Sequence, residues 1–157
     1  MSDKTAILNA LPAKISAIVD APEGSVDDKL LRVCETIDAD LTDYDWVGFY
    51  MVDPNAEREL VLGPYVGEAT DHIRIPFGRG ICGQAAETLE TFVVDDVNAA
   101  SNYLACSIHV KSEIVVPLMK GDVLLGELDI DSHTVAAFGE HDQKIMEELC
   151  DIISRLF

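Results

Sequence analysis

Residues 113–130, EIVVPLMKGDVLLGELDI, predict a β-hairpin in which two apolar strands flank a tight turn at Lys120-Gly121-Asp122. A second hairpin is expected over 46–65, where WVGFYMV is followed by a turn containing proline and asparagine and by another strand-like run. Hairpins join antiparallel strands, whereas parallel strands need long crossover connections. We therefore expect a mainly antiparallel central sheet.

The flanking segments predict helices. Apolar residues recur at helical spacing at both ends of the chain, over 5–20, over 26–41 and from about 139 onward. Such helices would cover one face of the sheet and leave the other face free for a pocket built from the middle loops. The expected fold class is α/β (α+β), and residues 1–157 are expected to form a single domain.

The composition restricts the classes of partner. The formal net charge is -18, with Asp+Glu 29 against Lys+Arg 11, so the surface repels nucleic acid phosphate and anionic lipid. No segment reaches the roughly 18–20 apolar residues that span a bilayer, and no signal peptide is recognisable. We expect a cytoplasmic protein with no nucleic acid or membrane partner. The acidic excess fits either a high-salt cytoplasm or simple solubility.

Four cysteines are present, and in a reducing cytoplasm they are not expected to form permanent disulfides. Cys34 and Cys150 lie on or beside apolar helical stripes, which indicates packing. Cys106 lies in a loop, and Cys82 follows glycines near the start of a short helix expected over 84–89, whose positive end would favour a thiolate. Although GRGICG resembles a nucleotide-binding loop, it lacks the parallel βαβ context and the downstream acid that such a site needs.

Residues two apart in two strand-like segments indicate a binding pocket. Asp129 and Asp131 are two apart in LDIDS, so both carboxylates point to the same side of a strand, as a pocket floor or as a solvated face. Trp46, Gly48 and Tyr50 also alternate onto one side. The glycine would leave a slot between two aromatic walls that could hold a methyl thioether, unless these are ordinary core aromatics.

An ordered set of segments resembles the free methionine-(R)-sulfoxide reductase family within the GAF domains. The segments are DYDWVGFY, LVLGPYVG, IRIPFGRGICGQAA, VVDDV, LACS, KSEIVVPL, GELDIDSH and AFGEHD. The resemblance covers about residues 43–142. It implies a GAF-like fold, thiol-dependent reduction of free methionine-(R)-sulfoxide without a metal or organic cofactor, and a homodimer.

The resemblance also implies roles for particular residues. Cys106 in LACS matches the nucleophilic cysteine, and Cys82 in GICG matches a cysteine that resolves the intermediate. The acids of the substrate pocket would be Glu113, Asp129 and Asp131, and its aromatic wall Trp46 and Tyr50. His72, where family members commonly carry a third cysteine, and Ser112 complete the expected substrate-binding set.

The expected reaction begins with attack of a Cys106 thiolate on the sulfoxide sulfur while a neutral carboxylic acid protonates the leaving oxygen. A second, ionised carboxylate would pair with the ammonium of the free amino acid. The resulting Cys106 sulfenic acid would condense with Cys82, and a thioredoxin-like dithiol would reduce the disulfide.

Two other functions are compatible with the residues. A non-catalytic GAF sensor would bind a small ligand without turnover, and a thiol redox switch would form a regulatory disulfide between Cys82 and Cys106 without a substrate. A metal site is not predicted, because the spacing Cys106-x-x-His109 has no second ligand pair beside it.

Overall fold

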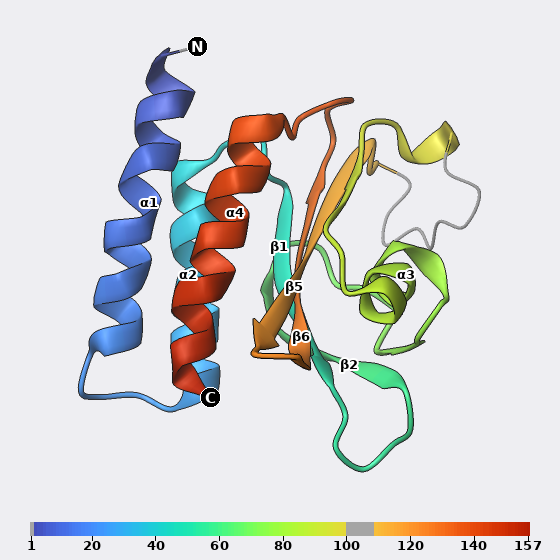
Figure 1. Ribbon diagram of the computed structural model, residues 1–157. Helices are drawn as coiled ribbons and strands as arrows, with labels where there is room; N and C mark the ends of the chain where they lie inside the picture. Colours follow the sequence, from blue (N-terminus) through green and yellow to red (C-terminus); the bar gives the residue numbers. More distant parts are fainter. Residues whose placement is uncertain (1, 100–108) are drawn as a thin grey trace.

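In the computed structural model of the chain, residues 2–99 and 109–157 are described (Figure 1). Six strands form a sheet in the order β3-β2-β1-β6-β5-β4, and each neighbouring pair is antiparallel. The strands are β1 Trp46–Val52, β2 Glu59–Val66, β3 Arg74–Pro76, β4 Phe92–Val94, β5 Ser112–Lys120 and β6 Val123–Ser132. Both predicted hairpins are present, β1 with β2 and β5 with β6, so the antiparallel fold expected from the sequence is confirmed.

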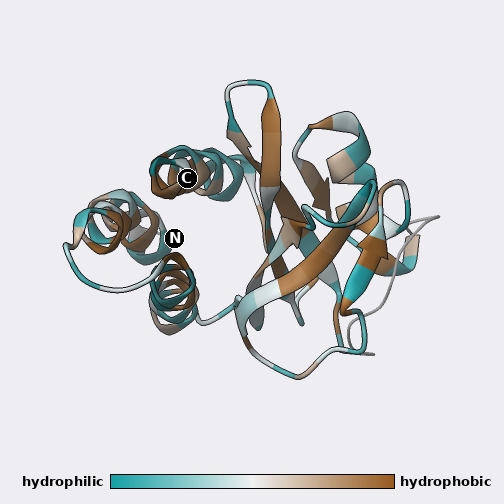
Figure 2. Cartoon of the chain, turned by 90° about the horizontal axis from the view of Figure 1, so that it is seen from below, coloured by the Kyte–Doolittle hydropathy of each residue, from teal (hydrophilic) through white to brown (hydrophobic). Residues whose placement is uncertain are grey.

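Three helices lie on one side of the sheet, and they are α1 Ser2–Asp20, α2 Val26–Asp40 and α4 Glu140–Ile153. Helices α2 and α4 pack directly on the sheet, and α1 packs against these two helices (Figure 1 and Figure 2). The short helix α3, Gly80–Thr88, lies on the opposite face, and single 3-10 turns occupy Val97–Ala99 and Ser154–Leu156. The sheet therefore separates a large apolar core under the three helices from a smaller one under α3. Within the described part of the chain, no helix is long and apolar enough to cross a membrane.

Helix α2 shows how local sequence sets these boundaries. Ser25 accepts a hydrogen bond from the Asp28 backbone N–H at 3.1 Å, and the Asp28 carboxylate accepts one from the Ser25 N–H at 3.2 Å. This reciprocal cap satisfies backbone donors that the first turn of a helix leaves unpaired. The following stripe, which includes Leu30 and Ile37, is fully buried against the sheet.

Two of the four cysteines belong to the core under the three helices, as predicted. Cys34 on α2 is buried with its thiol toward the Pro64 carbonyl at 3.7 Å, and Cys150 on α4 faces the Val116 carbonyl at 3.9 Å. Burial raises the pKa of both thiols. Each thiol is enclosed by the apolar side chains of this core and keeps its proton, so these two cysteines serve packing.

The register of β5 and β6 sets the position of the acids. Asp131 lies opposite Glu113, Asp129 opposite Val115, and the alternation extends back to Glu127. These four acidic side chains point away from the three-helix core and toward α3, where all four act on the Cys82 thiol, and all four are buried. The alternative of a solvated strand face is therefore wrong for Asp129 and Asp131, which are each 1% exposed.

Candidate active site

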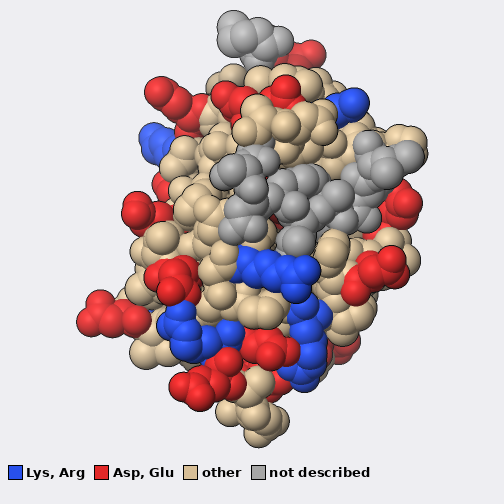
Figure 3. Space-filling model, turned by 90° about the vertical axis from the view of Figure 1, so that its right-hand side faces the viewer, with Lys and Arg blue, Asp and Glu red and all other residues tan. Residues whose placement is uncertain are grey.

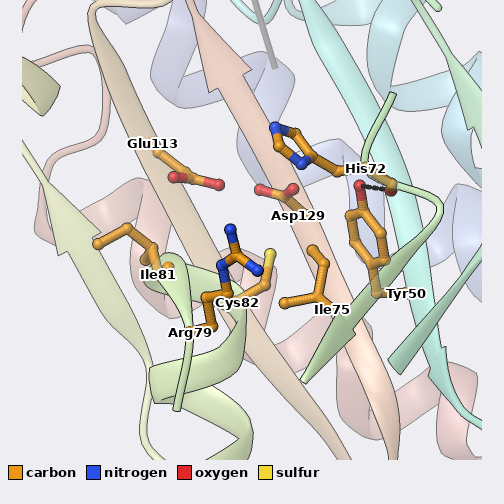
Figure 4. Close-up of a pocket in the computed structure, with 9 residues that line it drawn as sticks. Tyr50, His72, Ile75, Arg79, Ile81, Cys82, Glu113 and Asp129 are labelled. Carbon is orange, nitrogen blue, oxygen red and sulfur yellow. Dashed lines mark hydrogen bonds between the residues drawn. The ribbon is translucent and has the colours of Figure 1, made fainter. Parts of the chain in front are cut away.

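A small pocket lies between α3 and the acidic side of β5 and β6 (Figure 4). Its volume is about 10 Å³, close to the space that one water molecule needs. The lining residues come from β1, the segment around β3, α3, β5 and β6, and are Tyr50, His72, Ile75, Arg79, Gly80, Ile81, Cys82, Glu113 and Asp129. The fold thus gathers side chains that are up to 79 positions apart.

Two carboxylates and one thiol meet in the interior of this pocket. The Sγ of Cys82 and carboxylate oxygens of Glu113 and Asp129 all lie within 4.8 Å of one another. Asp131 and Glu127 flank Asp129 on the same side of β6. Sequence reasoning missed Glu127, although the alternation that identified Asp129 and Asp131 continues two residues further back in GELDIDS.

Burial changes the protonation of these acids. Burial first, and then the charge of Asp129, raise the pKa of Glu127 well above its usual value. Burial also raises the pKa of Asp129, and contact with the Glu113 and Cys82 side chains offsets part of that rise. Carboxyl groups with raised pKa values keep a proton at higher pH and can act as general acids.

Cys82 is the third residue of α3, because the helix begins at Gly80 instead of at the expected position 84. It is buried, and desolvation followed by the charges of Asp129 and Glu127 raises its pKa well above 9.0. The expectation of a thiolate at the helix N-terminus is therefore wrong. The positive end of a helix stabilises a negative charge by about 2 kcal/mol at most. Full burial raises the pKa of a thiol by several units, and each unit corresponds to about 1.4 kcal/mol, so burial is the larger effect.

Tyr50 and His72 are joined at the side of the pocket. The Tyr50 hydroxyl donates a hydrogen bond to the His72 backbone carbonyl at 2.8 Å, and the His72 N–H donates to the Thr70 hydroxyl at 3.1 Å. Tyr50 is fully buried, and the half-buried imidazole of His72 stands on the opposite side of the pocket from α3 (Figure 4). The buried tyrosine thus fixes the backbone that presents His72.

The slot expected between Trp46 and Tyr50 is closed. The Trp46 ring stacks on Tyr65 at 5.2 Å between centroids, and a Cβ placed on Gly48 would come within 2.5 Å of that ring. The indole N–H donates to the Glu68 carbonyl at 2.9 Å. The Trp46 ring therefore lies over Gly48, in the space where any other residue would have its side chain. Trp46 is not among the described residues that line the pocket.

Ser112, which was expected to bind substrate, also lies outside the pocket lining. Its hydroxyl donates to the Thr134 carbonyl at 2.6 Å and accepts from the Ala137 N–H at 3.3 Å. Neighbouring residues of a strand point to opposite faces, so Ser112 points away from the pocket that Glu113 lines. Its contacts hold the segment between β6 and α4. The predicted nucleophile, Cys106, lies outside the described residues.

Arg79 is the pocket residue with a positive charge. It precedes α3 as its N-cap residue, is exposed, and makes no salt bridge with any described residue. Sequence reasoning missed it, although its place directly before a glycine-rich helix start could have indicated an anion-binding position. The pocket therefore offers acids in its interior and one cation at its mouth.

Comparison with known proteins identifies the family to which most of the chain is similar. Residues 25–156 match the model of the GAF domain family. A free methionine-R-sulfoxide reductase of Saccharomyces cerevisiae is 40% identical over 114 residues, which are 72% of this chain and 63% of the relative. That of Escherichia coli is 38% identical over 109 residues, 69% of this chain and 64% of the relative. The matched region thus spans slightly less than two thirds of both relatives.

A solved structure matches over more of its length. The free methionine-R-sulfoxide reductase from Neisseria meningitidis, in complex with its substrate, is 39% identical and superposes with a TM-score of 0.93. The superposition covers 100% of this chain and 92% of that chain. The likeness therefore extends over the helices, the sheet and the pocket region together.

Proposed function

Because this chain belongs to the free methionine-R-sulfoxide reductase family of GAF domains, we propose that its pocket reduces free methionine-R-sulfoxide to methionine. The observation that carries the proposal is the cluster of buried carboxylates around Cys82, with Arg79 at the mouth. Buried carboxylates are costly unless a cation or a proton accompanies them. A pocket of this kind favours a ligand that brings its own positive charge.

A free amino acid supplies that charge and also a carboxylate. Its ammonium group would pair with Glu113 inside the pocket, and its carboxylate with the Arg79 guanidinium at the mouth. Methionine sulfoxide within a peptide has neither group, so this arrangement selects the free amino acid. Since the cavity has room for about one water molecule, the side chains that line it must move apart to admit the substrate.

The chemistry needs a nucleophile, a proton donor and a second thiol. A Cys106 thiolate attacks the sulfoxide sulfur, and Asp129, whose raised pKa favours its neutral form, protonates the sulfoxide oxygen, so that the S–O bond breaks and hydroxide leaves. Hydroxide then attacks the Cys106 sulfur and breaks its new bond to the methionine sulfur, which gives the Cys106 sulfenic acid and methionine. In net terms the thiol and the sulfoxide become a sulfenic acid and methionine. Cys82 then condenses with the sulfenic acid, which forms a disulfide and releases water, and a thioredoxin-like dithiol reduces that disulfide.

The high pKa of Cys82 supports this division of roles. A thiol that keeps its proton is a poor first nucleophile, so Cys82 is unsuited to attack the substrate. It can still resolve a sulfenic acid, which is a stronger electrophile, when its proton passes to a neighbouring carboxylate.

The test is turnover of free methionine-R-sulfoxide with thioredoxin, thioredoxin reductase and NADPH. We expect repeated turnover by the native chain and none by Cys106→Ser. Cys82→Ser should form one methionine per chain and then stop. As a matched control, Cys150→Ala removes a core thiol far from the pocket and should turn over normally while it remains folded. Methionine formation no faster than that of Cys106→Ser would refute the enzyme, and binding without turnover would indicate a sensor.

A further inference from the structure

We propose that Cys82, Glu113 and Asp129 form a binding site for a divalent transition-metal ion such as Zn²⁺ or Co²⁺. No ligand pattern in the sequence indicates such a site, because the three residues come from a helix and two strands that only folding brings together. The proposal is independent of turnover, since it concerns the same pocket without substrate. It goes beyond reductase chemistry, which requires no metal.

The geometry suits a single ion. One sulfur and two carboxylate oxygens lie within 4.8 Å of one another, and in a tetrahedral zinc site such atoms are about 3.5 Å apart. Small side-chain rotations therefore suffice to close the site around an ion. The two carboxylates point toward one another with the Cys82 sulfur beside them (Figure 4). The cavity of about 10 Å³ accepts an occupant the size of one water molecule.

The charge of the cluster supplies a second, separate reason. Within residues 2–99 and 109–157, no hydrogen-bond donor is well aligned with a carboxylate oxygen of Asp129 or of Glu127, although both side chains are almost completely buried. Neither residue forms a salt bridge with any lysine or arginine in the described ranges. A divalent cation would satisfy the Asp129 oxygens directly, and Glu127 would add negative charge just outside the coordination shell.

The ligand types select the class of metal. A thiolate with two carboxylates favours Zn²⁺ or Co²⁺ over Mg²⁺ and Ca²⁺, which prefer oxygen ligands alone. Three protein ligands leave a fourth coordination position open toward the mouth of the pocket. A bound ion would occupy the carboxylates that a substrate ammonium needs and would withdraw Cys82 from disulfide formation, so the metal-bound pocket is an inhibited state.

The experiment is a titration of the reduced, metal-free chain with Co²⁺ alone, in a phosphine reductant and without substrate. We expect one Co²⁺ per chain and a thiolate-to-cobalt charge-transfer absorption in the near ultraviolet, and we expect Zn²⁺ to abolish this absorption. Cys82→Ser should lose the absorption, whereas Cys150→Ser, with its thiol in the other core, should keep it. Circular dichroism confirms that each variant is folded.

A second pair of variants keeps the thiol and changes only the oxygen ligands. Asp129→Asn and Glu113→Gln should each weaken Co²⁺ binding at least tenfold. The proposal is overturned if Co²⁺ does not bind stoichiometrically, if the absorption survives Cys82→Ser, or if both carboxylate variants bind Co²⁺ as tightly as the native chain. Because no substrate is present, each of these outcomes is separate from success or failure of the reductase assay.

Discussion

Glu127 is completely buried, and the pKa of its carboxyl group is raised well above 4.5, first by burial and then by the charge of Asp129. The folded chain thus keeps this proton to higher pH than the unfolded chain does. Its contribution to stability is fully present below about pH 4.5 and is lost as the pH rises toward the folded pKa. Glu127→Gln replaces the carboxyl group with an amide that cannot ionise, so stability is no longer lost as the pH rises. We therefore expect the free energy of unfolding at pH 7.5 to rise by about 1–3 kcal/mol.

Urea denaturation of both chains at pH 5 and pH 7.5 measures this effect, and the gain should be larger at pH 7.5. Glu57→Gln is the matched control, because Glu57 is exposed and its substitution should leave stability unchanged at both pH values. An equal gain at the two pH values would mean that the protonation of Glu127 is not the cause.

These acids also show what the sequence can and cannot predict about single residues. Strand alternation correctly placed Asp129 and Asp131 on one side of β6, and the same rule, extended by one step, would have found Glu127. Alternation also placed Trp46 and Tyr50 on one side of β1. It could not predict which way the Trp46 ring leans, because that depends on Tyr65 in the neighbouring strand.

Helix α3 depends on a close backbone contact for its position. A Cβ on Gly83 would lie 2.6 Å from the Pro76 carbonyl oxygen and 3.0 Å from the Gly78 nitrogen, so only glycine lets the helix approach this loop. Gly83→Ala should push α3, and Cys82 with it, away from the acids. We expect a loss of about 1–3 kcal/mol in urea unfolding and a larger fall in methionine formation than the folded fraction explains.

Gly139→Ala provides the comparison, because its Cβ would have an ordinary contact at 3.7 Å; as an N-cap substitution it should cost no more than about 1 kcal/mol and leave methionine formation per folded chain unchanged. Native turnover in folded Gly83→Ala would show that the contact does not position Cys82.

From the sequence, helix α3 was expected to begin later than it does, since glycines disfavour helix interiors. The packing of residues 80–83 against the loop after β3 overrides that propensity. The hairpins and long helices, whose periodic patterns are strong, were predicted correctly.

The distribution of charge over the whole molecule determines how an anionic group reaches the pocket. A chain with a net charge of -18 repels a carboxylate, yet Lys and Arg side chains gather on the face beside α3, with Asp and Glu around them (Figure 3). Arg58 pairs with Glu87, and Arg74 pairs with Asp53 at 2.8 Å and with a second carboxylate. These two charges are therefore largely neutralised within the protein.

Arg79 keeps its charge available for a ligand, since it has no salt-bridge partner in the described ranges and lines the pocket. We expect Arg79→Met to raise the KM for free methionine-R-sulfoxide about fivefold, the effect of an ion pair worth about 1 kcal/mol, with little change in kcat. The ratio of the two KM values should shrink between 0.1 and 1 M salt, because the screening length falls from about 10 Å to about 3 Å. Arg155→Met, at the C-terminal end and away from the pocket, should leave KM unchanged. A KM for Arg79→Met equal to the native value at low salt would remove Arg79 from the substrate site and leave the buried acids as the sole basis for recognising the amino acid.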